Sequence, residues 1–207
     1  MRTGVYRFDG EKLNYLPLPI GDNTNPNNPH HVTNFASGKN NKIWISTYAG
    51  IFGYGDNSFT ILNEENLNVN KDQIHIRSVF EDSKGRLWIG NNSIGVLLHN
   101  KNTTINFTEK MGLGNKIQLT SNVTNSKEKL EHVFAIEEDG NGNIWFGDRD
   151  TGAWKYDGIS IINYGRKDGL TNSFVQEIYN DNNNELWFGL ANGDVFKFNG
   201  KGFDKKF

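Results

Sequence analysis

The stretch IEEDGNGNIWFGDRDTGAWKYDGISII, residues 136–162, decides the fold of this chain. A turn of Gly and Asn residues at 139–143 precedes the bulky run Ile144-Trp145-Phe146-Gly147. Gly and Asn tolerate positive φ in turns, whereas bulky and β-branched side chains favour strands. A second turn, 148–152, leads into residues 153–156, which alternate as a half-buried strand does. The pattern predicts two short strands joined by a tight turn.

Two further strands complete this unit. Residues 133–137 form a run rich in strand formers in front of the first turn. Asp157-Gly158 is a strong hairpin signal, and residues 159–164 follow it as a last strand. Four short strands joined by tight turns predict one small antiparallel sheet.

The same unit occurs four times along the chain. Its tryptophans are Trp44, Trp88, Trp145 and Trp187, at spacings of 44, 57 and 42 residues, so one insertion lies before the third unit. A period of 40–45 residues with four strands per unit is typical of a β-propeller blade. We predict an all-β chain, a single propeller domain over 1–207. The expected blades are 32–62, 76–108, 133–164 and 174–207, with an N-terminal half blade at 1–16.

The half blade bears on how complete the ring is. Residues 4–8 and 12–16 predict the last two strands of a blade whose inner strands are missing. Propellers normally protect sheet edges by closing the ring. We therefore expect the chain to be part of a larger ring, with a self-contained four-blade ring as the alternative. Exposed edges would also favour a dimer.

Several motifs resemble a known family, the two-component regulator propeller repeats. They are EDSKGRLWIG at 81–90, EEDGNGNIWFG at 137–147 and KDGLTNSFVQEI at 167–178. The resemblance implies the extracytoplasmic, periplasmic sensor region of a hybrid two-component histidine kinase. In that setting it would be fused to downstream signalling domains of a phosphorelay and would sense oligosaccharides. The sequence departs from the family in having no kinase or membrane segment.

Composition limits the partners. Lys and Arg number 22 against 24 Asp and Glu, for a net charge of −2, and the basic residues are dispersed. A phosphate backbone needs a basic face, so we expect no nucleic-acid partner. The chain has no cysteine, which excludes disulfides and thiol nucleophiles. No run of 18 apolar residues is present to predict a membrane span.

Binding is expected on one face of the propeller. The loops leading into each inner strand, and the turns between second and third strands, emerge together there and vary in length and sequence. The insertion before His132 lies on this face, and Arg149 can hold a carboxylate or sugar hydroxyls through its planar fork. The predicted ligand-binding residues are His75, Asn91, Asn92, His132, Arg149 and Asp150. The alternative is that Arg149 merely pairs with Asp148 or Asp150 in solvent.

Other chemistry is not favoured. Four histidines precede inner strands, but they come from three blades and no carboxylate has ligand spacing to them, so we expect no metal and no cofactor. Neighbouring carboxylates such as Glu138 and Asp139 point to opposite faces of a strand, and we expect them to start turns and accept backbone N–H groups. The repeated tryptophans and Trp154 are predicted to be core residues, and His99 to be partly exposed. No catalytic residue is assigned.

The favoured function is a non-catalytic sensor that binds a small molecule or an oligosaccharide. The first alternative is an enzyme, because residues 143–146 also resemble the repeats of streptogramin-lyase propellers. Such a lyase needs a histidine base beside a carboxylate or metal. The second alternative is a protein-interaction propeller without a small ligand.

Overall fold

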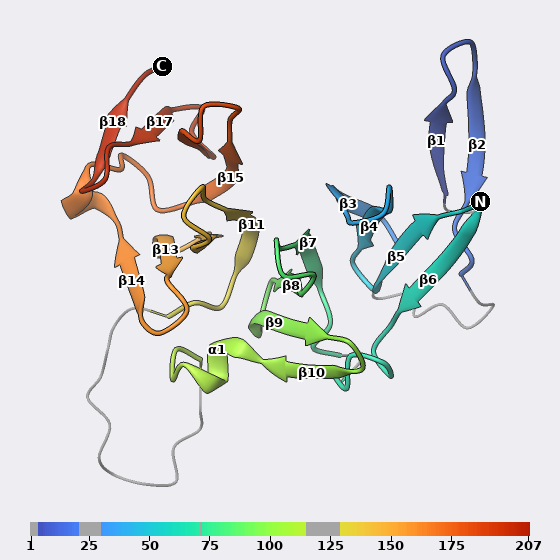
Figure 1. Cartoon of the computed structure of the whole chain (residues 1–207). Helices are drawn as coiled ribbons and strands as arrows, with labels where there is room; N and C mark the ends of the chain where they lie inside the picture. The colour runs from blue at the N-terminus through green and yellow to red at the C-terminus, as the bar shows by residue number, and fades with distance from the viewer. Residues whose placement is uncertain (1–3, 21–29, 71, 115–128) are drawn as a thin grey trace, which may run out of the picture.

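The computed structural model describes residues 4–20, 30–70, 72–114 and 129–207. The predicted all-β propeller is confirmed: four antiparallel sheets of four strands, each a blade, follow one another around a common axis (Figure 1). Blade one contains β3 (Val32–Ser37), β4 (Ile43–Thr47), β5 (Gly50–Gly55) and β6 (Ser58–Leu62); blade two contains β7 (Ile76–Glu81), β8 (Leu87–Asn91), β9 (Gly95–Asn100) and β10 (Thr103–Asn106). Blade three contains β11 (Val133–Glu138), β12 (Ile144–Asp148), β13 (Gly152–Tyr156) and β14 (Ile161–Tyr164); blade four contains β15 (Val175–Asn180), β16 (Leu186–Leu190), β17 (Val195–Phe198) and β18 (Phe203–Lys205).

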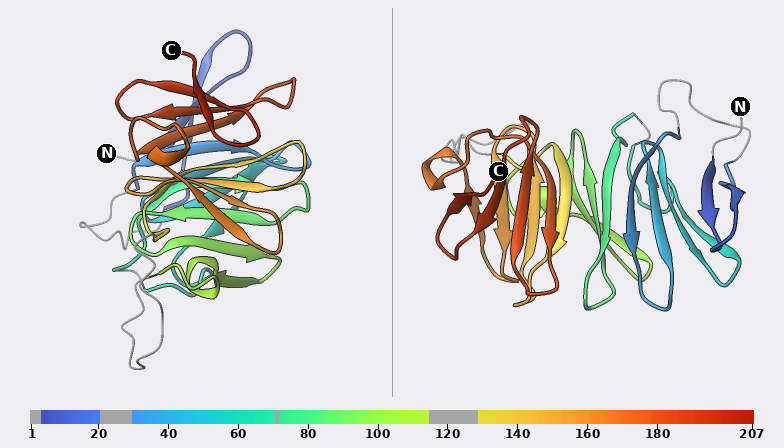
Figure 2. Two further views of the ribbon diagram at one scale, coloured as in Figure 1. Left: turned by 90° about the vertical axis from the view of Figure 1, so that its left-hand side faces the viewer. Right: turned by 90° about the horizontal axis from the view of Figure 1, so that it is seen from above.

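The first strand of each blade is the innermost. Strands β3, β7, β11 and β15 contact one another in chain order, and the later strands of each blade lie progressively outward. Figure 2 shows the sheets standing face to face, with the two ends of the chain at opposite ends of the row. The blades therefore form an arc whose inner edge is built from four first strands.

Three of the repeated turns are closed by an aspartate. Asp139 Oδ1 accepts hydrogen bonds from the backbone N–H groups of Asn141 and Asn143, both at 2.9 Å. Asp139 Oδ2 accepts the indole N–H of Trp145 at 2.9 Å. The pairs Asp82–Trp88 and Asp181–Trp187 repeat this bond at 2.8 and 2.9 Å. The prediction that acidic pairs start turns and accept their N–H groups is confirmed for Asp82 and Asp139, and each also fastens the tryptophan strand to its turn. Their neighbours Glu81 and Glu138 instead accept backbone N–H groups from the preceding blade.

The tryptophans pack each blade against the next one. The Trp88 ring lies 5.5 Å from that of Phe146 in blade three, and the Trp145 ring lies 4.7 Å from that of Phe198 in blade four. Trp44, Trp88, Trp145 and Trp154 are buried as predicted. Trp187 is only partly buried, contrary to prediction, because in the described structure no blade packs on the face that it presents.

An N-terminal hairpin of β1 (Gly4–Phe8) and β2 (Leu13–Pro17) stands beside blade one (Figure 1). Its two strands pair with each other in a separate two-stranded sheet. Val5 packs against the cluster around Leu18, whereas Tyr6, Phe8 and Leu13 are 68%, 63% and 66% exposed. The predicted strand pair is present, in contact with the propeller at Val5 and exposed over most of its length.

One local expectation was wrong. His99 is buried, because Thr104 lies opposite it on β10 and its Oγ1 is 2.8 Å from His99 Nδ1. The last strand of blade two ends at Asn106, where a short helix, α1 (Phe107–Lys110), begins. Asn106 caps this helix by accepting the backbone N–H of Glu109 at 2.9 Å. A 3-10 turn, η1 (Arg166–Asp168), lies between blades three and four.

Candidate functional site

One backbone hydrogen bond recurs at the same end of all four blades. The residue after each second strand donates its N–H to the carbonyl of the residue before the inner strand. The bonds are Tyr48 to His31 at 3.2 Å, Asn92 to His75 at 2.9 Å, Arg149 to His132 at 2.9 Å and Ala191 to Phe174 at 3.0 Å. We call these eight residues the rim. Because the backbone fixes the rim, its side chains can vary without changing the fold.

Each inner strand also carries a β-bulge beside the rim. The register shifts at the second residue of the strand, which is Thr33, Arg77, Phe134 or Gln176. A bulged residue is left out of the strand pairing, and its side chain is re-aimed. The four bulge residues differ in type, so the inner edge offers a different side chain in each blade.

The structure brings the six predicted site residues into two neighbouring blades. His75, Asn92, His132 and Arg149 belong to the rim, and Asn92 also pairs with His132 in an isolated bridge. Asp150 follows Arg149 in the turn. Asn91 ends β8 and is fully buried beneath the rim, so its amide can support this surface but does not form it.

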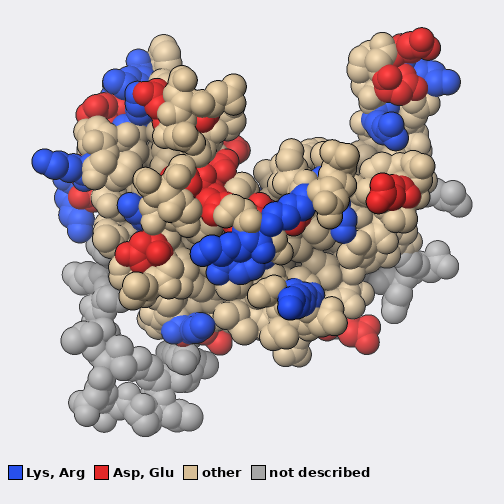
Figure 3. Space-filling view, in the orientation of Figure 1, with Lys and Arg blue, Asp and Glu red and all other residues tan. Residues whose placement is uncertain are grey.

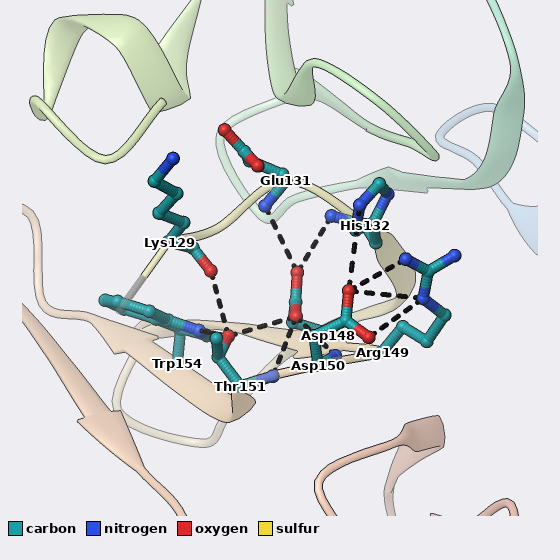
Figure 4. A network of polar contacts seen from close by, with 8 residues as sticks. All are labelled: Lys129, Glu131, His132, Asp148, Arg149, Asp150, Thr151 and Trp154. Carbon is teal, nitrogen blue, oxygen red and sulfur yellow. Dashed lines mark hydrogen bonds and ion pairs between the residues drawn. The ribbon is translucent and has the colours of Figure 1, made fainter. Parts of the chain in front are cut away.

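Asp148 fastens the loop before blade three to the turn that carries Arg149 (Figure 4). Its Oδ2 accepts the backbone N–H groups of Glu131 and His132 at 3.2 and 2.8 Å. Its Oδ1 accepts those of Asp150 and Thr151 at 2.8 and 2.9 Å. One buried carboxylate thus joins the loop before blade three to the turn. The 15-residue insertion itself lies mostly at 115–128, outside the described residues.

Arg149 and Asp150 form a two-bond ion pair at the surface. Arg149 Nε lies 3.0 Å from Asp150 Oδ1, and Arg149 Nη2 lies 2.9 Å from Asp150 Oδ2. This contact raises the pKa of Arg149 and lowers that of Asp150. His132 Nε2 is 3.6 Å from the same carboxylate. The pairing matches the alternative expectation for Arg149, and an exposed pair of this kind contributes under about 1 kcal/mol.

Sequence reasoning missed a row of stacked side chains that crosses all four blades. The guanidinium carbon of Arg77 lies 4.8 Å from the Tyr48 ring centre and 4.9 Å from that of Phe134. Phe134 in turn contacts Phe174 of blade four, with ring centres 4.8 Å apart. Tyr48 also contacts His75 at 4.6 Å. Arg77 is therefore a cation clamped between aromatic rings from the two flanking blades.

Buried polar atoms without a partner gather at this place. Within the described residues they include Arg77 Nε, His75 Nε2, Asn91 Nδ2, Asn92 Oδ1 and His132 Nδ1, all from blades two and three. Such atoms are rare in folded proteins, and a group of them marks a place where water or a ligand can make hydrogen bonds. Burial, helped by the charge of Arg77, lowers the pKa of His75, so its imidazole is neutral near pH 7.

Figure 3 shows the opposite end of the blades, that of the tight turns, where basic and acidic side chains lie side by side. Among the residues that the structure describes, no group of three or more His, Asp or Glu side chains is placed to hold a metal ion. The arrangement can therefore offer stacking, one clamped cation and several neutral polar groups.

Comparison with known proteins finds a family that matches two segments of the chain. The two-component regulator propeller family matches residues 71–93 and 128–150, which hold the rim residues of blades two and three. The chain carries two-component regulator propeller repeats. The two matched segments contain the turn aspartate, the tryptophan strand and the rim positions of blades two and three. A search of curated proteins gave no match.

Solved structures share the fold. One is described as the extracellular domain of a hybrid two-component system, BT3049, from B. thetaiotaomicron, at 22% identity and a TM-score of 0.60, covering 85% of this chain and 22% of that one. A second, BT4673 of the same organism, has 19% identity and a TM-score of 0.62, covering 93% and 24%. Virginiamycin B lyase from Staphylococcus aureus has 17% identity and a TM-score of 0.60, covering 85% and 55%.

The chain thus spans less than a quarter of the length of the two extracellular domains. At these identities the likeness shows the propeller fold and nothing finer. No helix among the described residues is long and apolar enough to cross a membrane.

Proposed function

We propose that this chain is a non-catalytic, ligand-sensing propeller module of a two-component signalling system and acts outside the cytoplasm. The ligand, a small molecule or an oligosaccharide, binds at the rim of blades two and three. Binding there would be passed through the rigid blades to downstream signalling domains of a phosphorelay. The family repeats and the sensor domains of similar fold support the signalling role.

The observation that carries the binding site is the contrast between the two ends of the blades. At the turn end, Asp82, Asp139 and Asp181 have their carboxylates occupied by turn N–H groups and indoles. At the rim end, the buried polar atoms of His75, Asn92 and His132 lack partners among the described residues. A ligand can satisfy these rim atoms at no cost to the fold, since backbone bonds hold the rim.

The test is a thermal-shift screen with neutral oligosaccharides, acidic oligosaccharides and small carboxylic acids. Hits are repeated with His132→Ala and Arg149→Ala at the rim, and with Lys84→Ala as the control. Lys84 is exposed in a turn at the opposite end of blade two. We expect the rim variants to lose the shift and the control to keep it. A shift that survives both rim substitutions would place the ligand elsewhere.

A lyase is the second candidate, and one contact favours it. His132 Nε2 lies 3.6 Å from Asp150 Oδ2, a histidine beside a carboxylate, as a general base requires. Against it, Asp150 is already paired with Arg149. Incubation with a cyclic streptogramin B lactone and Mg²⁺, followed by mass spectrometry, separates the two functions. The sensor proposal expects intact lactone; ring-opened product that disappears with His132→Ala would establish the enzyme.

A further inference from the structure

Arg77 combines a fixed position with unused hydrogen-bonding capacity. Its guanidinium is clamped by Tyr48 and Phe134, and its Nη1 donates to Tyr48 Oη at 3.2 Å. Its Nε is buried without an acceptor among the described residues. None of the ion pairs formed within the described residues includes Arg77. An arginine is always charged near neutral pH and has five N–H donors, so part of this donor set is unmatched.

The clamp restricts what can neutralise this cation. Aromatic rings cover the guanidinium, so a hydrogen-bonding partner must approach along its edge. Since Nε is buried and only one N–H of Nη1 is engaged by Tyr48, the edge formed by Nη1 and Nη2 remains. A carboxylate is planar and matches such an edge with two parallel hydrogen bonds. A dianionic phosphate would call for further cations, and the neighbouring His75 is held neutral by burial and by Arg77 itself.

We propose that Arg77 binds the carboxylate of an acidic ligand, with the ligand's ring lying along Tyr48, Phe134 and Phe174. This inference rests on the proposed sensor function and names the ligand class for the same site. The partnerless atoms His75 Nε2 and Asn92 Oδ1 supply an imidazole and an amide for ligand hydroxyl groups. Apolar walls with a few fixed polar groups are the usual composition of small-molecule sites.

The experiment measures binding by calorimetry with four probes and four forms of the protein. The probes are trigalacturonate, its fully methyl-esterified form, monomeric galacturonate and succinate. The proteins are the wild type, Arg77→Met, Arg77→Lys and the exposed control Lys84→Met. We expect the wild type to bind trigalacturonate at least about tenfold more tightly than the neutral ester. Arg77→Met should abolish this preference, Arg77→Lys should retain part of it, and Lys84→Met should retain all of it.

The small probes identify the source of the carboxylate. Equal affinity for succinate and trigalacturonate indicates that the ligand is a free small acid, whereas tighter binding of the trimer indicates an acidic saccharide. Either result supports the role of Arg77 if Arg77→Met removes the binding of the acid. Equal binding of acid and ester by the wild type, or no binding of any acid, overturns the inference. An ester that still binds leaves the sensor function standing. If Arg77→Met does not fold, the test is the ratio of the affinities for trigalacturonate and its ester, compared between the wild type and Arg77→Lys. A lower ratio in Arg77→Lys supports the inference, and an equal ratio overturns it.

Discussion

Trp44 of blade one donates its indole N–H to Glu81 of blade two, with Nε1 2.6 Å from Oε2. The other three repeated tryptophans use an aspartate six residues earlier in their own blade. In blade one that position is Gly38, which has no side chain to accept the bond. A Cβ placed on Gly38 would lie 2.6 Å from Trp44 Nε1 and 2.7 Å from Glu81 Oε2, so this glycine makes room for both partners of the hydrogen bond.

Glu81→Ala should therefore destabilise the protein by about 1–3 kcal/mol, because the partly buried indole loses a charged acceptor. Glu81→Gln should cost less, since an amide oxygen can still accept the bond. Urea unfolding followed by tryptophan fluorescence measures both changes. In the Glu81→Ala background, Gly38→Asp should recover part of the loss, whereas in the wild type it should destabilise. Equal effects of Gly38→Asp in the two backgrounds would contradict the conclusion that Glu81 takes the place of the aspartate used in the other blades.

The tryptophans should differ in what they contribute to stability. Trp145 is fully buried against blade four, whereas Trp187 is partly exposed. Trp145→Ala should cost about 3–5 kcal/mol through lost burial and a cavity. Trp187→Ala should cost clearly less, although both indoles donate a hydrogen bond to an aspartate. Similar midpoints of urea unfolding for the two variants would show that a further surface covers Trp187 in solution.

The blades were predictable because each carries its own local signals. The run Ile144-Trp145-Phe146-Gly147 after a Gly and Asn turn specifies a strand and its hairpin within a few residues, and three other units repeat it. The role of the turn aspartate was predictable for the same reason, because the N–H groups that donate to it are local. The bond between Trp44 and Glu81 was not, since it depends on how two blades are placed.

The candidate site was likewise predictable only in part. His75 and His132 could be placed near one another because both immediately precede an inner strand. Arg77 and Phe134 were missed because a β-bulge results from pairing between strands and leaves no mark in a single strand. Aligning the four units would have given a signal: their shared position holds Thr33 and Gln176 in the outer blades, and a large stacking side chain in the middle two.

Asp148 should control the shape of the rim. It accepts four backbone hydrogen bonds while almost fully buried, and burial raises its pKa. Asp148→Ala leaves those N–H groups without acceptors and should cost about 1–3 kcal/mol. Hydrogen exchange should rise at Glu131, His132 and Thr151 and stay unchanged at Asp181, whose own turn is independent. Unchanged protection at His132 would mean that other contacts hold the loop.

Glu137 should give the protein a pH-dependent stability. Burial raises its pKa from the ordinary 4.5 to about 7, and the charges of Glu177 and Glu138 add to the effect. Between these two values the unfolded chain releases the proton that the folded protein keeps, so stability should fall as pH rises from about 4.5 to 7. The shift corresponds to at most about 3 kcal/mol, and solvent screening of this partly exposed group should reduce it to about 1–2 kcal/mol.

Glu137→Gln removes this ionisation. Relative to the wild type, the variant should be unchanged or slightly weaker near pH 4 and more stable near pH 8, where the wild type must bury a charge. Glu65→Gln, in an exposed loop, is the matched control, and its stability should change with pH as that of the wild type does. Urea midpoints at pH 4, 6 and 8 measure the difference. If the stability of Glu137→Gln and of the wild type changes equally with pH, then the Glu137 carboxylate is better solvated than its place between blades three and four implies.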